Sequence, residues 1–179
     1  MPPIINRTMD SFRTFYDFTD LKEHLKDQGP DCSVGLIPTM GALHEGHLSL
    51  VKRAIIETDI VVLTIFVNPK QFNKKSDLQT YPRTIENDIA LLSTFEKLIV
   101  CIPKENEVYP FNDPYPNVDL GNLNDILEGK YRPGHFEGVA HVVHNLFHFV
   151  KPTKAYFGLK DYQQFAVIKK RNSCCFTKQ

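Results

Sequence analysis

The sequence has no excess of charge of either sign, since its 21 Lys and Arg residues balance 21 Asp and Glu residues. A chain without a basic surplus is a poor binder of polyanions, so we expect no nucleic-acid partner. The sequence also lacks any run of about 18 apolar residues, the length that spans a bilayer. Its first residues, MPPIINRTMDSF, lack the apolar stretch of a secretory signal. We therefore expect a cytoplasmic protein with no membrane association.

Cysteine is scarce and shows no pattern, since the four cysteines are Cys32, Cys101, Cys174 and Cys175. No pair has the CxxC spacing, so neither a disulfide framework nor a zinc site is predicted from them. Cys101 lies inside the apolar run LIVCI, where a cysteine behaves as a small buried hydrophobic residue. Cysteine usage therefore favours a reduced protein.

Short apolar runs alternate with helical patterns along the chain, and apolar residues make up 42% of its 179 residues. This length and composition suffice for one sizeable core. Strands are predicted at 34–37, 60–67, 98–102 and 154–157, and helices at 10–27, 44–57, 81–95, 137–150 and 161–172. The strand segments are apolar throughout, as in parallel sheets covered on both faces. The order predicts an α/β fold with a doubly wound parallel sheet flanked by helices.

We expect one domain over residues 1–179, in which residues 1–10 and 172–179 are flexible. Between 104 and 133 the sequence is rich in Pro, Asn, Asp and Tyr. This composition predicts an irregular surface segment with a short helix near 123–129. Loops of this length tend to have a function.

Polar residues follow three of the four predicted strands, at the point where each strand ends. These residues are His44 and His47 after the first strand, Asn68 and Gln71 after the second, and Lys160, Asp161 and Gln164 after the fourth. Ligands of parallel sheets bind at the carboxyl ends of the strands. We therefore expect the three groups to converge on one site.

The segment HEGH places His44 and His47 at the predicted start of a helix. Free backbone N–H groups and the helix dipole favour an anion there. Gly46 leaves room for a phosphate to approach the backbone, and the imidazoles can donate hydrogen bonds to its oxygens. Taken alone, the segment fits a phosphate site or a solvated polar helix start. Zinc is the weaker third alternative, because a spacing of three suits zinc ligands less well.

Two further motifs also have both a functional and a structural interpretation. In FGLKDYQQ, Lys160 can neutralise an anion, whereas Asp161 can cap the helix that follows. In FVNPKQF, Asn68 and Gln71 can bind a substrate hydroxyl or carboxylate, or they can form a polar turn.

Histidines and an arginine surround the start of the long helix at 137–150. In YRPGHF, Arg132 can grip an anion, with His135 beside it, or both can belong to a surface loop. The stripe His141, His144 and His148 lies on one helix face. We interpret this stripe as a solvated face rather than a metal site.

Five motifs occur in order over residues 34–170: PTMGALHEGHLSLV, FVNPKQF, DLQTYPRT, YRPGHFEGVAHVV and FGLKDYQQ. Together they resemble the pantothenate synthetase (pantoate–β-alanine ligase) family, and the HxGH core resembles HIGH-motif nucleotidylyltransferases with a Rossmann-like domain. The resemblance implies an ATP-dependent ligase of coenzyme A precursor biosynthesis. Such an enzyme joins pantoate to β-alanine through pantoyl adenylate and releases AMP and pyrophosphate. It also implies a homodimer.

The resemblance assigns a role to each matching position. It implies catalytic roles at the ATP phosphates for His44, His47 and Lys160, and ATP contacts for Pro38, Thr39, Met40, Gly41, Gly46, Gly158 and Asp161. It implies pantoate contacts for Met40, Asn68, Gln71 and Gln164, a supporting role for Arg132 and His135, and a Mg²⁺-associated role for Asp88.

The sequence departs from the family at two positions and at its end. His141 stands where the family usually has Thr, and Asn145 where it usually has Lys. The tail RNSCCFTKQ does not resemble the family, whose members continue into a smaller domain that closes over ATP. We expect this C-terminal lid domain to be absent and activity of the chain alone to be low. Another HIGH-motif nucleotidylyltransferase and an inert ligand-binding fragment are the alternatives.

Overall fold

Five parallel strands form one sheet in the order β1-β4-β3-β2-β5 in the computed structural model, which describes residues 12–111, 113, 128–158 and 162–171. The strands are β1 (Arg13–Phe15), β2 (Val34–Thr39), β3 (Ile60–Ile65), β4 (Leu98–Cys101) and β5 (Lys154–Ala155). The central strand β3 reads IVVLTI, and all six of its residues are buried. Branched apolar side chains on both faces are what a strand between two helical layers requires.

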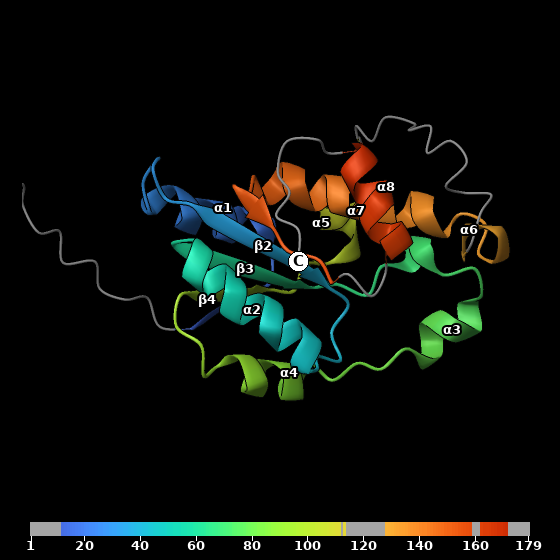
Figure 1. Ribbon diagram of the computed structural model, residues 1–179, viewed down its shortest axis with the longest axis horizontal. Helices are drawn as coiled ribbons and strands as arrows, with labels where there is room; N and C mark the ends of the chain where they lie inside the picture. Colours follow the sequence, from blue (N-terminus) through green and yellow to red (C-terminus); the bar gives the residue numbers. More distant parts are fainter. Residues whose placement is uncertain (1–11, 112, 114–127, 159–161, 172–179) are drawn as a thin grey trace, which may run out of the picture.

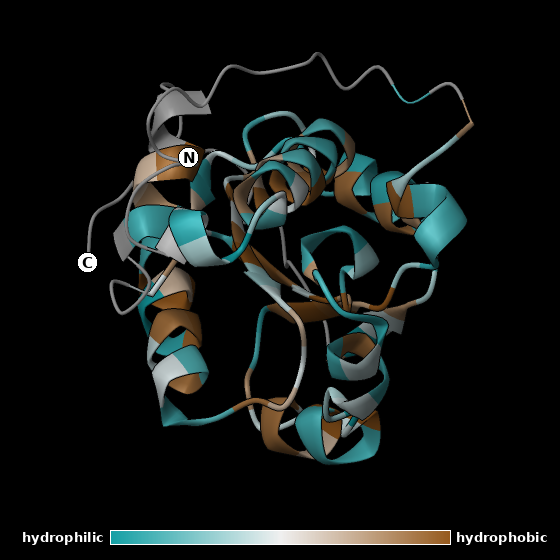
Figure 2. Ribbon diagram, turned by 90° about the vertical axis from the view of Figure 1, so that its right-hand side faces the viewer, coloured by the Kyte–Doolittle hydropathy of each residue, from teal (hydrophilic) through white to brown (hydrophobic). Residues whose placement is uncertain are grey.

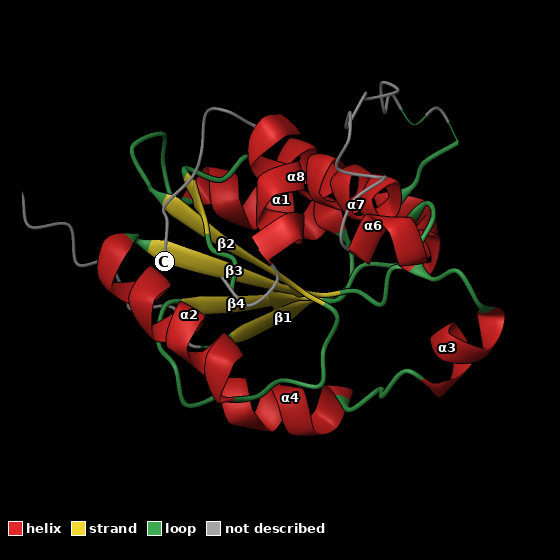
Figure 3. Ribbon diagram, turned by 45° about the vertical axis from the view of Figure 1, so that its right-hand side comes forward, coloured by secondary structure: helices red, strands yellow, loops and turns green. Residues whose placement is uncertain are grey.

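Helices cover both faces of this sheet (Figures 1 and 3). The longer helices are α1 (Phe18–Asp27), α2 (Glu45–Glu57), α4 (Ile85–Leu92), α7 (His135–Val150) and α8 (Tyr162–Arg171). The shorter ones are the 3₁₀ helix η1 (Pro69–Gln71), α3 (Lys75–Thr80), α5 (Glu105–Val108) and α6 (Glu128–Tyr131). Helices α1, α7 and α8 lie on one face, and α2 and α4 on the other. The predicted α/β class is therefore confirmed.

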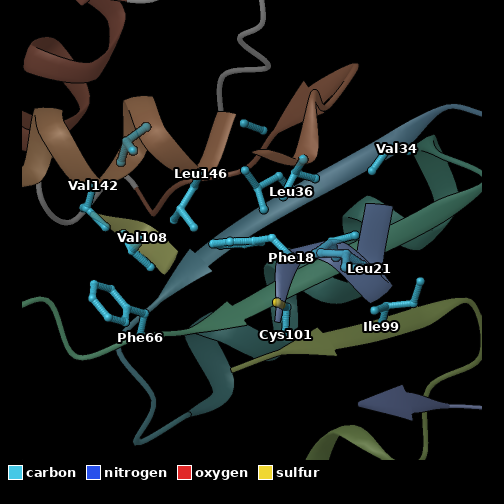
Figure 4. Close-up of a cluster of buried hydrophobic side chains, with 14 of the residues drawn as sticks. Phe18, Leu21, Val34, Leu36, Phe66, Ile99, Cys101, Val108, Val142 and Leu146 are labelled. Carbon is cyan, nitrogen blue, oxygen red and sulfur yellow. The ribbon is translucent and has the colours of Figure 1, made fainter. Parts of the chain in front are cut away.

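Each face of the sheet has its own hydrophobic core. On one face, Phe18 of α1 and Leu146 of α7 point toward the strands (Figure 4). On the other, Val51 of α2 and Leu92 of α4 pack against β3 and β4. The strands in Figure 2 are largely hydrophobic, whereas the helices mix hydrophobic and hydrophilic residues. The helices therefore present one apolar side each to the sheet.

Cys101 is fully buried in the first of these cores. Burial, with smaller contributions from the carboxylates of Glu107 and Asp17, raises the pKa of its thiol to about 12. A thiol with so high a pKa does not ionise at neutral pH and is chemically inert. The interpretation of Cys101 as a small hydrophobic residue agrees with this burial.

The predicted helix at 10–27 was wrong in its first part, because residues 13–15 form strand β1. Arg13, Thr14 and Phe15 pair in parallel with residues 99–101 of β4, so backbone pairing at the sheet edge overrides the local helical pattern. Helix α1 begins only at Phe18, after the Asp17 carboxylate accepts from the Asp20 N–H at 2.8 Å. Helices α3 and α5 are short and were not predicted.

Several expectations lie outside the described residues. These are the flexible ends at 1–10 and 172–179 and most of the helix predicted near 123–129, of which only α6 is described. In the part of the chain that the structure does describe, no helix combines the length and apolar character needed to cross a membrane.

The strand order determines where a ligand can bind. The chain moves from β2 through β3 to β4 in one direction, whereas β5 pairs with the opposite side of β2. Helix α2 leaves β2 toward one face, and α8 follows β5 on the other (Figure 3). Where connections diverge in this way, the carboxyl ends of the strands border a crevice that typically binds the ligand.

Candidate functional site

A cavity of about 550 Å³ lies at the carboxyl ends of β2, β3 and β5. This volume is in the range of small-molecule sites, about 300–1,000 Å³. Predicted site residues from all three strand ends line it, namely Pro38, Thr39, Met40, Gly41, His44, Gly46, His47, Asn68, Gln71, Gly158 and Gln164. The three polar groups thus converge, although their roles toward a ligand stay predictions.

The other predicted residues lie beside this cavity or outside the described chain. Arg132 and His135 line a side cavity of about 150 Å³, which shares Met40, Gln71 and Gln164 with the main one. Lys160 and Asp161 are among the residues that the structure does not describe. The two cavities together therefore contain the predicted residues from the described chain, with the exception of Asp88.

The side chains of His44 and His47 cap the start of α2 by accepting from the backbone N–H groups of Gly46 and His44. The Nδ1 atom of His44 accepts from the Gly46 N–H at 3.0 Å, and the Nδ1 atom of His47 accepts from the His44 N–H at 3.3 Å. This is a capping box built from two imidazoles. Because each Nδ1 accepts, the neutral rings hold their proton on Nε2. Each ring therefore offers an Nε2–H donor to a ligand.

The structure explains the glycine at position 46 differently from the sequence analysis. A Cβ atom at this position would lie 2.8 Å from Cε1 of His44. The space where a side chain would begin is therefore taken by the His44 ring. Glycine at this position allows His44 to fold back onto the helix start, which the capping bond requires.

The pKa of His47 is lowered below its ordinary value, mainly by burial and also by the neighbouring His44. The Asp88 carboxylate acts in the opposite direction. The His44 and His47 rings lie with centroids 4.2 Å apart, so two positive charges there would repel each other. His47 is consequently neutral at pH 7, in the state that caps the helix.

Asp88 of α4 holds the loop between β2 and α2. Its carboxylate accepts from the backbone N–H of Ala42 at 3.0 Å and of Leu43 at 2.8 Å. Gly41 and Ala42 both have positive φ, 81° and 51°, so this turn is held in an unusual conformation. Asp88 is buried, and its carboxylate is committed to the backbone. Its metal role stays a prediction, and the described residues contain no group of three metal-ligating side chains.

The carboxamides of Asn68 and Gln71 are held by α7. Asn68 Nδ2 donates to the Gln71 Oε1 atom and to the Gly138 carbonyl, both at 3.0 Å. His135 Nδ1 donates to the Gln71 carbonyl at 2.8 Å. A Cβ atom on Gly138 would lie 2.3 Å from the Lys70 carbonyl oxygen, so only glycine permits this approach of α7 to η1. The motifs containing these residues therefore form one packed unit.

Sequence reasoning missed the apolar wall of the cavity. This wall includes Phe66, Tyr81, Val139, Val142, Val143 and Phe157. Helical spacing alone assigns the valines to the core face of the long helix, because a lining position and a core position have the same spacing. Tyr81 lies in the quoted motif DLQTYPRT, which was the available signal. Burial and the Asp88 carboxylate raise the pKa of its hydroxyl, so it stays protonated.

A sequence model of the Pantoate-beta-alanine ligase family matches residues 11–174. The chain belongs to this family. Pantothenate synthetase from Porphyromonas gingivalis (strain ATCC BAA-308 / W83) is 51% identical over 162 residues, which cover 90% of this chain and 56% of that protein. The Staphylococcus haemolyticus (strain JCSC1435) pantothenate synthetase is 44% identical over 158 residues, 88% of this chain and 55% of that protein. The chain thus spans about half the length of the curated relatives it matches.

Solved pantoate–β-alanine ligases share this fold. The structure from Francisella tularensis, described as complexed with beta-gamma ATP and beta-alanine, has a TM-score of 0.84 and 35% identity. It covers 94% of this chain and 68% of that chain. The Thermus thermophilus ligase has a TM-score of 0.79 and 43% identity, over 89% of this chain and 56% of that one. The expected family and Rossmann-like fold are confirmed.

The histidine stripe of this ligase-family member is only partly a solvated face. His148 is exposed, as expected. His141 is only partly exposed and pairs with the Asp113 carboxylate, so the interpretation was wrong for that residue. Its neighbour Asn145 is buried and donates to the Val108 carbonyl at 2.7 Å. His141 and Asn145 therefore contact the end of α5 and Asp113, which follows it.

Proposed function

We propose that this chain is the ATP- and pantoate-binding part of a pantoate–β-alanine ligase of coenzyme A precursor biosynthesis. In the proposed reaction, pantoate and ATP give pantoyl adenylate and pyrophosphate, and β-alanine then gives pantothenate and AMP. One observation carries the proposal. The cavity joins two imidazole Nε2–H donors at the start of α2 to the carboxamides of η1, in a chain of this family.

ATP would bind with its phosphates at the start of α2. In the first step a pantoate carboxylate oxygen attacks the α-phosphorus, and pyrophosphate leaves with its electron pair. This displacement needs positioned donors more than a strong base. His44 and His47 supply such donors, and the helix dipole adds partial positive charge. Lys160 would add a full charge there. Pro38, Thr39, Met40, Gly41, Gly46, Gly158 and Asp161 would form the rest of the nucleotide site.

Pantoate would bind between β3 and α8. The amide groups of Gln71 and Gln164 would hold its hydroxyl and carboxylate, with Met40 and Asn68 shaping the pocket. In the second step the β-alanine amine attacks the acyl carbon, and AMP leaves. Arg132 lines the side cavity that borders Gln71 and Gln164, and a guanidinium there suits a carboxylate. The Francisella tularensis ligase described as complexed with beta-gamma ATP and beta-alanine supports ATP and β-alanine as ligands.

Mg²⁺ would accompany ATP, and it is usually held by phosphates and one or two carboxylates. Asp88 fits this task poorly, because its carboxylate binds the N–H groups of Ala42 and Leu43. Asp88 would act on the loop that carries Met40 and His44.

The proposed reaction is tested by incubating the purified chain with ATP, pantoate and β-alanine and measuring AMP and pantothenate. Pantoate-dependent AMP formation is the expected result, at a low rate. Nucleotide transfer to a different alcohol or phosphate acceptor would instead identify another nucleotidylyltransferase. Ligand binding without any turnover would show that the chain binds the substrates but requires another part of the enzyme for catalysis.

We also propose that the chain acts in the cytoplasm as a homodimer, with all of residues 1–179 belonging to one domain. The family resemblance supports the dimer. Light scattering at micromolar concentration should give twice the chain mass. A mass equal to one chain at all concentrations would contradict this part of the proposal.

A further inference from the structure

Asn68 determines which end of the Gln71 carboxamide faces the cavity. Asn68 is 1% exposed and forms hydrogen bonds through both ends of its amide. Its Oδ1 atom accepts from the Lys70 N–H, and its Nδ2 group donates to the Gly138 carbonyl and to Gln71 Oε1. Because the Gln71 oxygen is occupied, its Nε2 group is the end that reaches Met40, at 2.9 Å from the sulfur. Gln71 thus presents a donor to a ligand.

Tyr109 supplies the shortest of the Asn68 hydrogen bonds. Its hydroxyl donates to Asn68 Oδ1 at 2.6 Å. Tyr109 follows α5 and does not belong to the lining of either described cavity. It therefore reaches the cavity through Asn68, which lines it.

The Tyr109 ring is held from several sides. The Lys70 ammonium lies 3.8 Å from the ring centroid. The Phe66 ring packs against it edge-on at 6.1 Å, and the His141 ring does so at 4.8 Å. These contacts join the segment after β3, the segment after α5 and helix α7.

Asp113 connects the segment after α5, which contains Tyr109, to α7. Its carboxylate accepts from His141 Nε2 and, at 3.2 Å, from Asn145 Nδ2. Lys70 Nζ donates to His141 Nδ1 at 3.4 Å, so one neutral imidazole links the ammonium to the carboxylate. His141 and Asn145 are the two positions where the chain departs from the family pattern.

We propose that Tyr109 is a positioning residue for the hydroxy-acid substrate, held by Asp113 with His141 and Asn145. Tyr109 orients Asn68, and Asn68 orients the Gln71 carboxamide with its donor toward the cavity. The proposal rests on the proposed function, because it takes the ligand of Gln71 to be pantoate. It adds a residue outside the cavity that acts on the affinity for this acid and not on that for ATP.

The test replaces Tyr109 with Phe, which removes only the hydroxyl. Tyr16→Phe is the matched control, since Tyr16 is exposed and lies between β1 and α1. Calorimetry measures the Kd of pantoate and of ATP separately for each variant of the 179-residue chain. Loss of one hydrogen bond predicts a rise of about three- to tenfold in the pantoate Kd for Tyr109→Phe. The ATP Kd of Tyr109→Phe and both Kd values of Tyr16→Phe should be unchanged.

A double-variant cycle separates positioning from general loosening. If Tyr109 acts through Gln71, Tyr109→Phe should not weaken pantoate binding further in a Gln71→Ala background. Asp113→Ala, which releases His141 and Asn145, should raise the pantoate Kd in the same selective way. Additive losses, or equal losses for ATP and pantoate, would overturn the positioning role.

A measurement without ligand makes the test independent of the substrate. The side-chain amide signals of Asn68 and Gln71 in ¹⁵N NMR should move toward those of free amides in Tyr109→Phe and stay fixed in Tyr16→Phe. Unchanged signals would overturn the proposal that Tyr109 orients Gln71 through Asn68. If the unaltered chain binds no pantoate, the proposed function fails and the substrate role of Tyr109 fails with it. If it does bind, an unchanged Kd in Tyr109→Phe overturns the inference alone.

Discussion

His44 and His47 each use one ring nitrogen for the fold and offer the other to a ligand. Their Nδ1 atoms accept backbone N–H groups at the start of α2, which fixes the tautomer of each neutral ring. Sequence reasoning placed both residues at a helix start, and the structure agrees. The ring orientation could not be predicted, because it depends on the space at Gly46 and on hydrogen bonds between residues two and three positions apart.

The two tasks of His44 can be separated by substitution. His44→Ala should lose the cap and about 1 kcal/mol of unfolding free energy, whereas His44→Asn should keep most of it, because Asn is a good N-cap residue. Both variants should lose ATP affinity, since neither has the Nε2–H donor. Urea unfolding and calorimetry with ATP measure the two effects. An Asn variant as unstable as the Ala variant would contradict the capping role.

The free energy of unfolding should fall as the pH drops below the ordinary pKa of histidine. In the folded state, burial and the neighbouring His44 lower the pKa of His47, and the Asp88 carboxylate offsets part of this shift. The unfolded chain, with a histidine pKa of about 6.5, then binds the proton first, so the contribution is intact above that pH. It is lost as the pH falls through the lowered folded pKa.

His47→Gln keeps a capping-box acceptor but has no titrating ring. Its unfolding free energy should therefore decline less between pH 7.5 and pH 5.5 than that of the unaltered chain, both values being about one unit either side of the ordinary pKa. Urea unfolding at the two pH values measures this difference. Parallel declines in the two proteins would show that His47 does not cause the pH dependence.

At the scale of elements, the contact of α7 with η1 connects packing to ligand binding. Gly138 allows α7 to approach the backbone of Lys70 and Gln71, and this approach brings the Gly138 carbonyl to Asn68. Local sequence predicted α7 within two residues at its start, since it has a long, clear apolar stripe. It did not predict β1, whose three residues are stabilised by pairing with a strand more than 80 residues away.

Gly138→Ala is expected to be destabilising although alanine is the better helix former. A Cβ atom there would lie 2.3 Å from the Lys70 carbonyl oxygen and 2.8 Å from the Gln71 nitrogen. Relief requires η1 to move, at a cost of roughly 1–3 kcal/mol for overpacking. Thermal unfolding and a pantoate titration should both detect the change. His148→Ala, at an exposed position of the same helix, is the control, and an equally stable Gly138→Ala would contradict the account.

At the scale of the whole molecule, the alternation of apolar runs and helical patterns was enough to predict the parallel sheet and the strand ends that border the cavity. The order of parallel strands brings their carboxyl ends together, so the convergence of HEGH with NPKQ and Gln164 followed from topology. Contacts between distant segments could not be predicted in this way. Asp88 reaches the Leu43 backbone across 45 residues, and Tyr109 reaches Asn68 across 41.

The central claim is that the strand-end cavity binds pantoate through Gln71. The most direct measurement is a calorimetric titration of pantoate into the unaltered chain, into Gln71→Ala and into Gln79→Ala, which alters an exposed glutamine on α3. Binding should weaken about tenfold or more in Gln71→Ala, because a hydrogen bond to a charged or polar substrate group is lost. Gln79→Ala should bind as the unaltered chain does. No pantoate binding by the folded chain, or equal affinity in all three proteins, would contradict the account.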